Sequence, residues 1–190
     1  VWSPDHARIA FAREIGGAFD LCMLVVATRA YSCDLTVNAA GGNQRTPAWS
    51  PGGDWLAYAS DHDGDEDIYR VAIVNGLPSG TAYNLTTRAT NDGNDSDPDW
   101  HGDWIVYQTD RDGNLEIFAM FADADAYDAT NDGQRRQRLT TTGAGIMNFQ
   151  PAWSPNGNRI AYTTNAYSSG NAEDDIVLLP DPPTRLPQFP

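Results

Sequence analysis

Apolar and polar positions along the chain repeat in four copies of one pattern. Each copy begins with a tryptophan, and these four are Trp2, Trp49, Trp100 and Trp153. A turn sequence follows in each copy, such as "SPGG" or "SPNG", and then an aliphatic and an aromatic residue two positions apart. Because strand side chains alternate between two faces, this spacing places the aliphatic and the aromatic side chain on one face of a strand.

Each copy continues with further apolar segments of strand length. The third segment is led by Leu21, Ile68, Ile117 or Ile176. Clusters of Gly, Pro, Asp and Asn separate the segments, and no stretch keeps a helical period for three turns, so we expect antiparallel strands. A Leu-Thr pair marks the fourth strand in three copies. These pairs are Leu35-Thr36, Leu85-Thr86 and Leu139-Thr140.

Four-stranded units that repeat at about 40–50 residues are typical of β-propeller blades. We therefore predict an all-β fold, a β-propeller of four-stranded antiparallel blades. The predicted blades are residues 1–44, 45–96, 97–148 and 149–179, of which the last is incomplete. Residues 180–190 contain five prolines and are predicted to form an extended tail.

Three quoted segments carry a resemblance to a known family. "PAWSPNGNRIAY" (151–162), "DRDGNLEIF" (110–118) and "RRQRLT" (135–140) resemble the repeat of TolB-like β-propellers, which are WD-like modules of periplasmic and secreted bacterial proteins. The resemblance covers nearly the whole chain. It implies a docking platform for proteins, or an appendage of a peptidase. Such propellers usually close with six or more blades, so we expect this chain to belong to a larger ring or to pair with a neighbouring subunit; a closed ring of four blades is the alternative.

Charge and hydropathy narrow the range of partners. The chain has 26 acidic and 12 basic residues, with a net charge of −14. This charge disfavours nucleic acids and anionic lipid surfaces and suits a cationic partner or metal ions. The longest apolar run, Leu21–Ala27, is too short to span a membrane. Because Val1 lies inside a motif, we expect a mature fragment or a piece of a longer protein.

One acidic loop is a candidate metal site. In "SDHDGDEDIY" (60–69), Asp61, Asp63, Asp65 and Asp67 alternate around Gly64. Several carboxylate oxygens could therefore converge on Ca²⁺, the hard cation that such ligands favour. The alternative is a turn that contains Asp and Gly for backbone reasons alone. The sequence leaves both interpretations open.

Cys22 and Cys33 are the only cysteines. Their predicted positions in neighbouring antiparallel strands are compatible with a disulfide, and two buried free thiols are the alternative. A disulfide would place the protein outside the cytoplasm, in agreement with the periplasmic or secreted bacterial location that the resemblance implies.

Signals for catalysis are weak. His6 and His101 are expected at the rim opposite His62, which argues against a triad or a three-histidine zinc site, and no G-x-S-x-G motif occurs. Paired carboxylates for glycoside cleavage stay open because acidic residues are plentiful. Trp55 and Trp104 precede the second-strand aliphatic residue and are candidates for contact with a protein or a glycan.

These observations favour a non-enzymatic, extracytoplasmic propeller module for protein–protein interaction or assembly, with structural calcium as an option. The alternatives are the non-catalytic propeller portion of a larger secreted hydrolase or peptidase, and a carbohydrate-active propeller.

Overall fold

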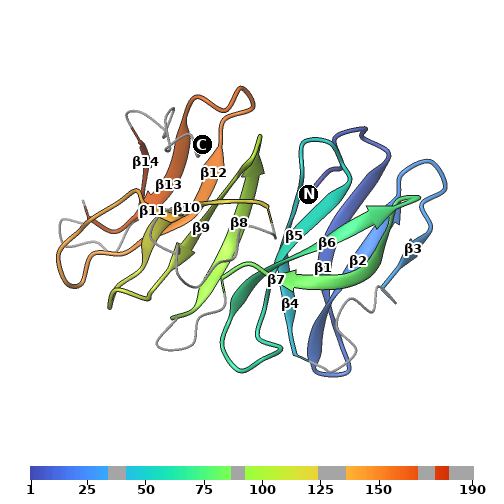
Figure 1. Cartoon of the computed structure of the whole chain (residues 1–190), viewed down its shortest axis with the longest axis horizontal. Coiled ribbons are helices and arrows are strands. Elements are labelled where there is room, and N and C mark those ends of the chain that lie inside the picture. Colours follow the sequence, from blue (N-terminus) through green and yellow to red (C-terminus); the bar gives the residue numbers. More distant parts are fainter. Residues whose placement is uncertain (34–41, 87–92, 124–135, 167–173, 180–190) are drawn as a thin grey trace.

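The computed structural model describes residues 1–33, 42–86, 93–123, 136–166 and 174–179. Within these residues the chain forms four antiparallel sheets, which stand side by side in chain order (Figure 1). The predicted all-β propeller architecture is confirmed, as a partial propeller. We call the sheets blades 1 to 4. Among the described residues, no helix is long and apolar enough to cross a bilayer.

The two middle blades have four strands each, in meander order. Blade 2 comprises β4 (Gln44–Trp49), β5 (Trp55–Ser60), β6 (Asp67–Val74) and β7 (Leu77–Asn84). Blade 3 comprises β8 (Asp95–His101), β9 (Trp104–Thr109), β10 (Glu116–Phe121) and β11 (Arg136–Arg138).

The two outer blades each show three strands. Blade 1 comprises β1 (Arg8–Ile15), β2 (Ala18–Val25) and β3 (Tyr31–Ser32). Its first strand is reduced to an isolated bridge between Trp2 and Ile9. Blade 4 comprises β12 (Asn148–Trp153), β13 (Ile160–Thr164) and β14 (Asp175–Leu178).

The predicted position of the fourth strand was wrong. Strand β7 begins directly after a two-residue turn at Asn75–Gly76, where both residues have positive φ, as type I′ hairpins require. The pair Leu85-Thr86 follows this strand rather than forming it. The Ile68 N–H donates to Thr86 Oγ1 at 2.9 Å, so the threonine anchors the start of the third strand. Thr140 repeats this contact with the Ile117 N–H at 2.8 Å, and the pair at 35–36 lies outside the described residues.

The first strand of blades 2, 3 and 4 contains the same β-bulge. Pairing shifts register just before the tryptophan, and one residue there has positive φ in each blade, namely Thr46, Asp97 or Gln150. Proline follows each of these residues. Since bulges increase local twist, this repeated irregularity bends every first strand in the same way.

Side chains between the blades form the core. Each blade turns an aromatic-rich face toward the preceding blade and a face richer in small residues toward the next. The cluster between blades 1 and 2 consists of Ala10, Leu21, Met23, Trp49, Leu56, Tyr58, Tyr69 and Val71. The cluster between blades 2 and 3 includes Ala48, Ala57, Ala59, Ile68, Ile105, Tyr107, Phe118 and Met120.

The outward faces of blades 1 and 4 carry the same residue types as the internal junctions. Trp2 is 57% exposed, whereas its counterpart Trp49 is 8% exposed against blade 1. Ile176 is 80% exposed, whereas its counterpart Ile68 is fully buried against blade 3. Apolar faces of this kind suit another sheet. The expectation of a larger ring or a neighbouring subunit stays a prediction.

A disulfide joins β2 to the segment after β3. Cys22 and Cys33 are bonded, with their Cα atoms 4.0 Å apart and eleven positions apart in the chain. The structure thus contains the predicted pairing. The bond fastens a blade whose fourth strand has only two residues.

We expect that replacing both cysteines with alanine lowers the free energy of unfolding by about 3 kcal/mol, because a short closed loop restricts the unfolded chain. Denaturant titration of both proteins, with and without reductant, measures this difference. Reductant should destabilise the wild type and leave the double variant unchanged. Equal stability of the two oxidised proteins would contradict the expectation.

Candidate functional site

A groove lies between blades 2 and 3, at the rim formed by the turns between first and second strands, which we call the A–B rim. Its volume is about 690 Å³. The side chains that determine its chemistry are aromatic residues, acidic residues and one arginine. They are Asp54, Trp55, Arg70, Trp100, Asp103 and Phe121. We call this cavity the blade 2–3 groove.

Arg70 ties the two walls of the groove together. Its Cζ lies 4.1 Å from the centre of the Trp55 ring, a cation–π distance. From there the guanidinium reaches across to blade 3, where Nη1 donates to the Ala122 carbonyl and Nη2 lies 3.6 Å from Asp123 Oδ1. Because Arg70 is almost fully buried, these contacts hold Trp55 in a fixed orientation at the groove.

The structure separates the two tryptophans predicted to contact a partner. Trp55 is half-buried and lines the groove. Trp104 stacks on Phe121, with ring centres 3.9 Å apart, and packs against the core between blades 3 and 4. Of the two tryptophans, Trp55 therefore lines the blade 2–3 groove, and Trp104 packs against the core between blades 3 and 4.

The four predicted calcium ligands do not all lie in one cluster. Carboxylate oxygens of Asp63, Asp65 and Asp67 lie within 4.8 Å of one another. Asp61 instead accepts hydrogen bonds from the backbone N–H and the side-chain amide of Asn43, at 2.5 and 2.6 Å. The structure thus narrows the candidate ligand set from four residues to three.

Asp67 is the buried member of this acidic loop. It accepts hydrogen bonds from Asn84 at 2.7 Å and from the Thr86 hydroxyl at 2.8 Å. Burial raises the pKa of Asp67 to about 6; these donors oppose the shift, and the charges of Asp63 and Asp65 add to it. Asp67 is therefore first a structural residue, which anchors the end of blade 2.

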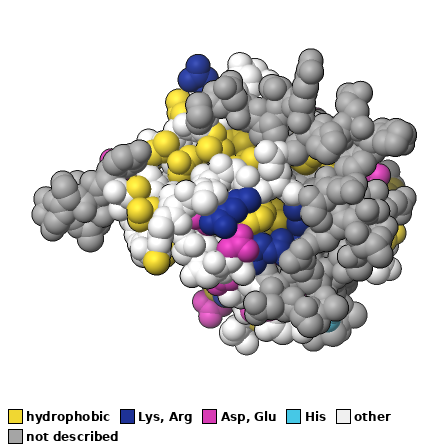
Figure 2. All heavy atoms as spheres, turned by 60° about the vertical axis from the view of Figure 1, so that its left-hand side comes forward, with side chains coloured by type: hydrophobic (Ala, Val, Ile, Leu, Met, Phe, Trp, Pro, Cys, Tyr) yellow, Lys and Arg dark blue, Asp and Glu magenta, His cyan; other side chains and the backbone are white. Residues whose placement is uncertain are grey.

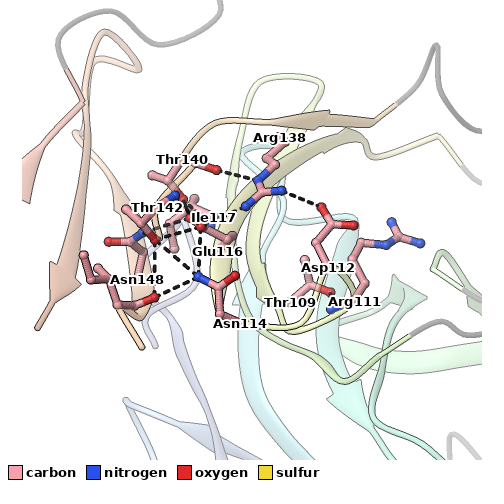
Figure 3. A network of polar contacts seen from close by, with 11 residues as sticks. Thr109, Arg111, Asp112, Asn114, Glu116, Ile117, Arg138, Thr140, Thr142 and Asn148 are labelled. Carbon is pink, nitrogen blue, oxygen red and sulfur yellow. Dashed lines mark hydrogen bonds and ion pairs between the residues drawn. The ribbon is translucent and has the colours of Figure 1, made fainter. Parts of the chain in front are cut away.

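Glu116 holds the corresponding place in blade 3, in a denser network (Figure 3). Its carboxylate accepts hydrogen bonds from five residues on three segments of chain. The donors are Asn114, Arg138, Thr140, Thr142 and Asn148. Burial alone would raise the pKa of Glu116, but the hydrogen bonds from Thr140, Thr142 and Asn148 outweigh it and lower the pKa to about 2. The residue stays ionised and joins blade 3 to blade 4.

Asp95 is a buried acid that the sequence analysis missed. It begins β8 and stands five residues before Trp100, as Asn148 stands five residues before Trp153. Its side chain is fully buried, and burial raises its pKa to about 7 despite the nearby Thr109 hydroxyl. Alignment of the repeats on their tryptophans could have identified this position, because it shows an acid in blade 3 where blade 4 has the amide Asn148. Burying a carboxylate costs more free energy than burying an amide.

The three histidines lie apart, each beside a different aromatic ring. His6 is next to Trp2, His62 next to Tyr69 and His101 next to Trp153.

The side of the molecule that carries β8–β14 shows basic and acidic side chains close together around a small apolar patch (Figure 2). Arg138 of β11 forms an ion pair with Asp112 at 2.9 Å.

Four repeated antiparallel sheets with their cores at the junctions define the class of protein as a β-propeller. The chain matches the model of the PD40 family, described as the TolB beta propeller domain, over residues 1–172. It belongs to this family. No curated protein matches the sequence.

Solved structures show the same fold at low sequence identity. TolB from Acinetobacter baumannii is similar with a TM-score of 0.69 and 18% identity, over 93% of this chain and 39% of that chain. A putative TolB from Agrobacterium tumefaciens gives a TM-score of 0.68 and 22% identity, over 93% of this chain and 58% of that chain. The present chain thus spans less than two thirds of either TolB structure.

Enzymes also contain this fold. Prolyl oligopeptidase B from Galerina marginata is similar with a TM-score of 0.56 and 14% identity, over 93% of this chain and 24% of that chain. At these identities the likeness concerns the fold alone, and a fold by itself does not define an activity.

The buried Asp95 should make stability depend on pH. Its folded-state pKa is raised, so the native state holds a proton that the unfolded chain releases, and stability falls as pH rises from about 4 to about 7. We expect that Asp95→Asn, which copies Asn148, removes the contribution of Asp95 to this fall, while that of Asp67 remains. The variant should be about 2–4 kcal/mol more stable than wild type at pH 8 and similar to it at pH 4.

Urea titrations at a series of pH values measure this effect, with the exposed Asp103→Asn as the matched control. A stability difference that is the same at pH 4 and pH 8 would show that Asp95 does not titrate in this range.

Calcium binding at Asp63, Asp65 and Asp67 stays a prediction. If Ca²⁺ binds the folded protein there, EDTA should lower the melting temperature, and Asp63→Ala or Asp65→Ala should blunt this response. Asp61→Ala is the control, because Asp61 lies outside the cluster and the response should persist. A melting curve that is indifferent to EDTA would remove calcium from the account.

Proposed function

We propose that this chain is a non-enzymatic, extracytoplasmic propeller module that binds a protein partner at its A–B rim, with the blade 2–3 groove as the main contact. The observation that carries the proposal is the groove itself. Trp55 and Trp100 line a cavity of about 690 Å³ at a junction between rigid sheets. Aromatic side chains fixed by their surroundings are the residues that most often dominate protein interfaces.

Three further observations support this proposal. The family is a propeller domain family, and the fold leaves the turns at its rims free to meet another molecule. The disulfide between Cys22 and Cys33 agrees with a location outside the cytoplasm, periplasmic or secreted. A net charge of −14 disfavours nucleic acid as the partner.

A second candidate is the non-catalytic propeller portion of a larger secreted hydrolase or peptidase. It rests on the fold shared with prolyl oligopeptidase B, of which this chain covers 24%. The same groove would then face another domain of the larger protein. Sequencing of the full gene distinguishes the two candidates, because a hydrolase would bring its own nucleophile motif.

A photo-crosslinking residue in place of Trp55 tests the first candidate in an envelope extract of the source bacterium. We expect a discrete crosslinked protein that is competed by excess wild-type chain but not by Trp55→Leu. The same crosslinker at Asp112, outside the groove, is the control. The purified partner should then bind Trp55→Leu at least about tenfold more weakly than wild type, as for an interface anchor. Equal crosslinking from position 112, or equal affinity for both proteins, would contradict the proposal.

A further inference from the structure

We infer that the blade 2–3 groove accepts a basic side chain, arginine or lysine, of the protein partner. This inference rests on the proposed function, since it names the chemical group that the partner would insert. Three features of the structure carry it: a neighbouring groove filled by an arginine of this chain, carboxylates at the mouth of the groove, and its aromatic walls.

The neighbouring groove, between blades 1 and 2 at the same rim, is already filled by an arginine. Arg8 lines it, and a Cβ placed on Gly76 of blade 2 would lie only 2.0 Å from Arg8 Cζ. The guanidinium thus lies directly against the turn of the next blade, 3.6 Å from Asp5. The remaining volume of that groove is about 270 Å³.

The blade 2–3 groove differs at two repeated positions. Arg70 stands where blade 1 has Met23, and its guanidinium crosses the groove to the Ala122 carbonyl of blade 3. Arg8 precedes the aliphatic residue of the second strand in blade 1, and Trp55 takes this place in blade 2. The Trp55 ring stays on its own blade, packed on Arg70 and beside Tyr83 at 6.3 Å. No long basic side chain from this position enters the groove, which keeps a volume of about 690 Å³ beside Arg70.

The charge around the larger groove suits a cation. Asp54, Asp103 and Asp123 line it, against Arg70 as its one lining arginine. Arg70 is engaged with Asp123. Within the described part of the chain, Asp54 and Asp103 form no ion pair, and both are exposed on the A–B turns of adjacent blades. A basic side chain entering between these turns would meet a carboxylate on either side.

The aromatic walls complete the site. Trp100 lies on blade 3 opposite Trp55, and a guanidinium or ammonium group gains cation–π stabilisation on such indole rings when water is partly excluded. A neutral sugar could also stack on them. Its hydroxyl groups would donate hydrogen bonds to the two carboxylates that lack a basic partner but would leave their charge uncompensated, so the charge favours the cation.

A heptapeptide with one arginine, Ac-Gly-Ser-Gly-Arg-Gly-Ser-Gly-NH₂, is the probe. Its citrulline counterpart has nearly the same shape without the charge. Titration of the intact chain, followed by two-dimensional NMR and tryptophan fluorescence, should show the arginine peptide binding about tenfold more tightly than the citrulline peptide. Raising NaCl from 20 to 500 mM should weaken the arginine peptide only, through screening.

Four substitutions test whether the arginine peptide binds in the blade 2–3 groove. Asp54→Asn and Asp103→Asn should each weaken the arginine peptide about two- to fivefold, as expected for exposed charges. Asp5→Asn makes the same charge change on the same rim, in the groove that Arg8 fills, and should have no effect. Trp55→Arg places in blade 2 the residue type found at the same position in blades 1 and 4, and should abolish binding while the melting curve stays cooperative.

Each result bears on the inference. Equal binding of the arginine and citrulline peptides, or equal effects of Asp103→Asn and Asp5→Asn, would overturn it. Displacement of the peptide by a neutral oligosaccharide, insensitive to salt, would identify a glycan groove instead and would also overturn it. If the Trp55 crosslink to a protein persists in excess arginine peptide, the inference fails while the proposed function stands.

Discussion

Packing of one sheet's aromatic face on the smaller side chains of the preceding sheet holds this molecule together. Tyr58 and Trp49 of blade 2 pack on Ala10 and its neighbours in blade 1, and Tyr107 of blade 3 packs on Ala57 and its neighbours in blade 2. Large side chains against small ones let the sheets approach closely without voids. Among the described residues, the three clusters of buried apolar side chains all lie at junctions between blades, so the backbone of the junctions has little freedom to change.

Under this constraint the two rims have different roles. At the rim of the turns between second and third strands, buried acids tie consecutive strands and blades together. Glu116 reaches Thr140 and Asn148, and Asp67 reaches Asn84 and Thr86. The carboxylates of Glu116 and Asp67 are thus already engaged in hydrogen bonds that hold the fold. The A–B rim carries fewer such ties across its junctions, so its grooves can differ from one blade pair to the next without loss of the scaffold.

The sequence predicted what depends on repetition within a strand and missed what depends on contacts between blades. Alternation of apolar positions sufficed for four antiparallel sheets. The fourth strand was misplaced because Leu85-Thr86 is an anchor whose hydroxyl caps the third strand, and a sequence pattern does not distinguish anchor from strand. Asp61 was grouped with its neighbours by spacing, but its partner Asn43 lies eighteen residues away. The size of the blade 2–3 groove depends on side chains from two blades.

In a repeated scaffold, a difference in one side chain between blades changes the chemistry of one local site. The reason is that the backbone places equivalent residues in equivalent surroundings. Asn148 and Asp95 occupy the same position, yet the amide completes a network around Glu116 while the acid is buried with a raised pKa. Arg8 and Trp55 occupy another shared position; the arginine lies in its groove against the next blade, whereas the indole packs on Arg70 and leaves a larger volume open. Since the junction cores keep the sheets in place at both positions, the difference in each pair arises from the substituted side chain and not from a changed fold. Function in this chain is therefore best sought where one blade departs from the pattern of the others.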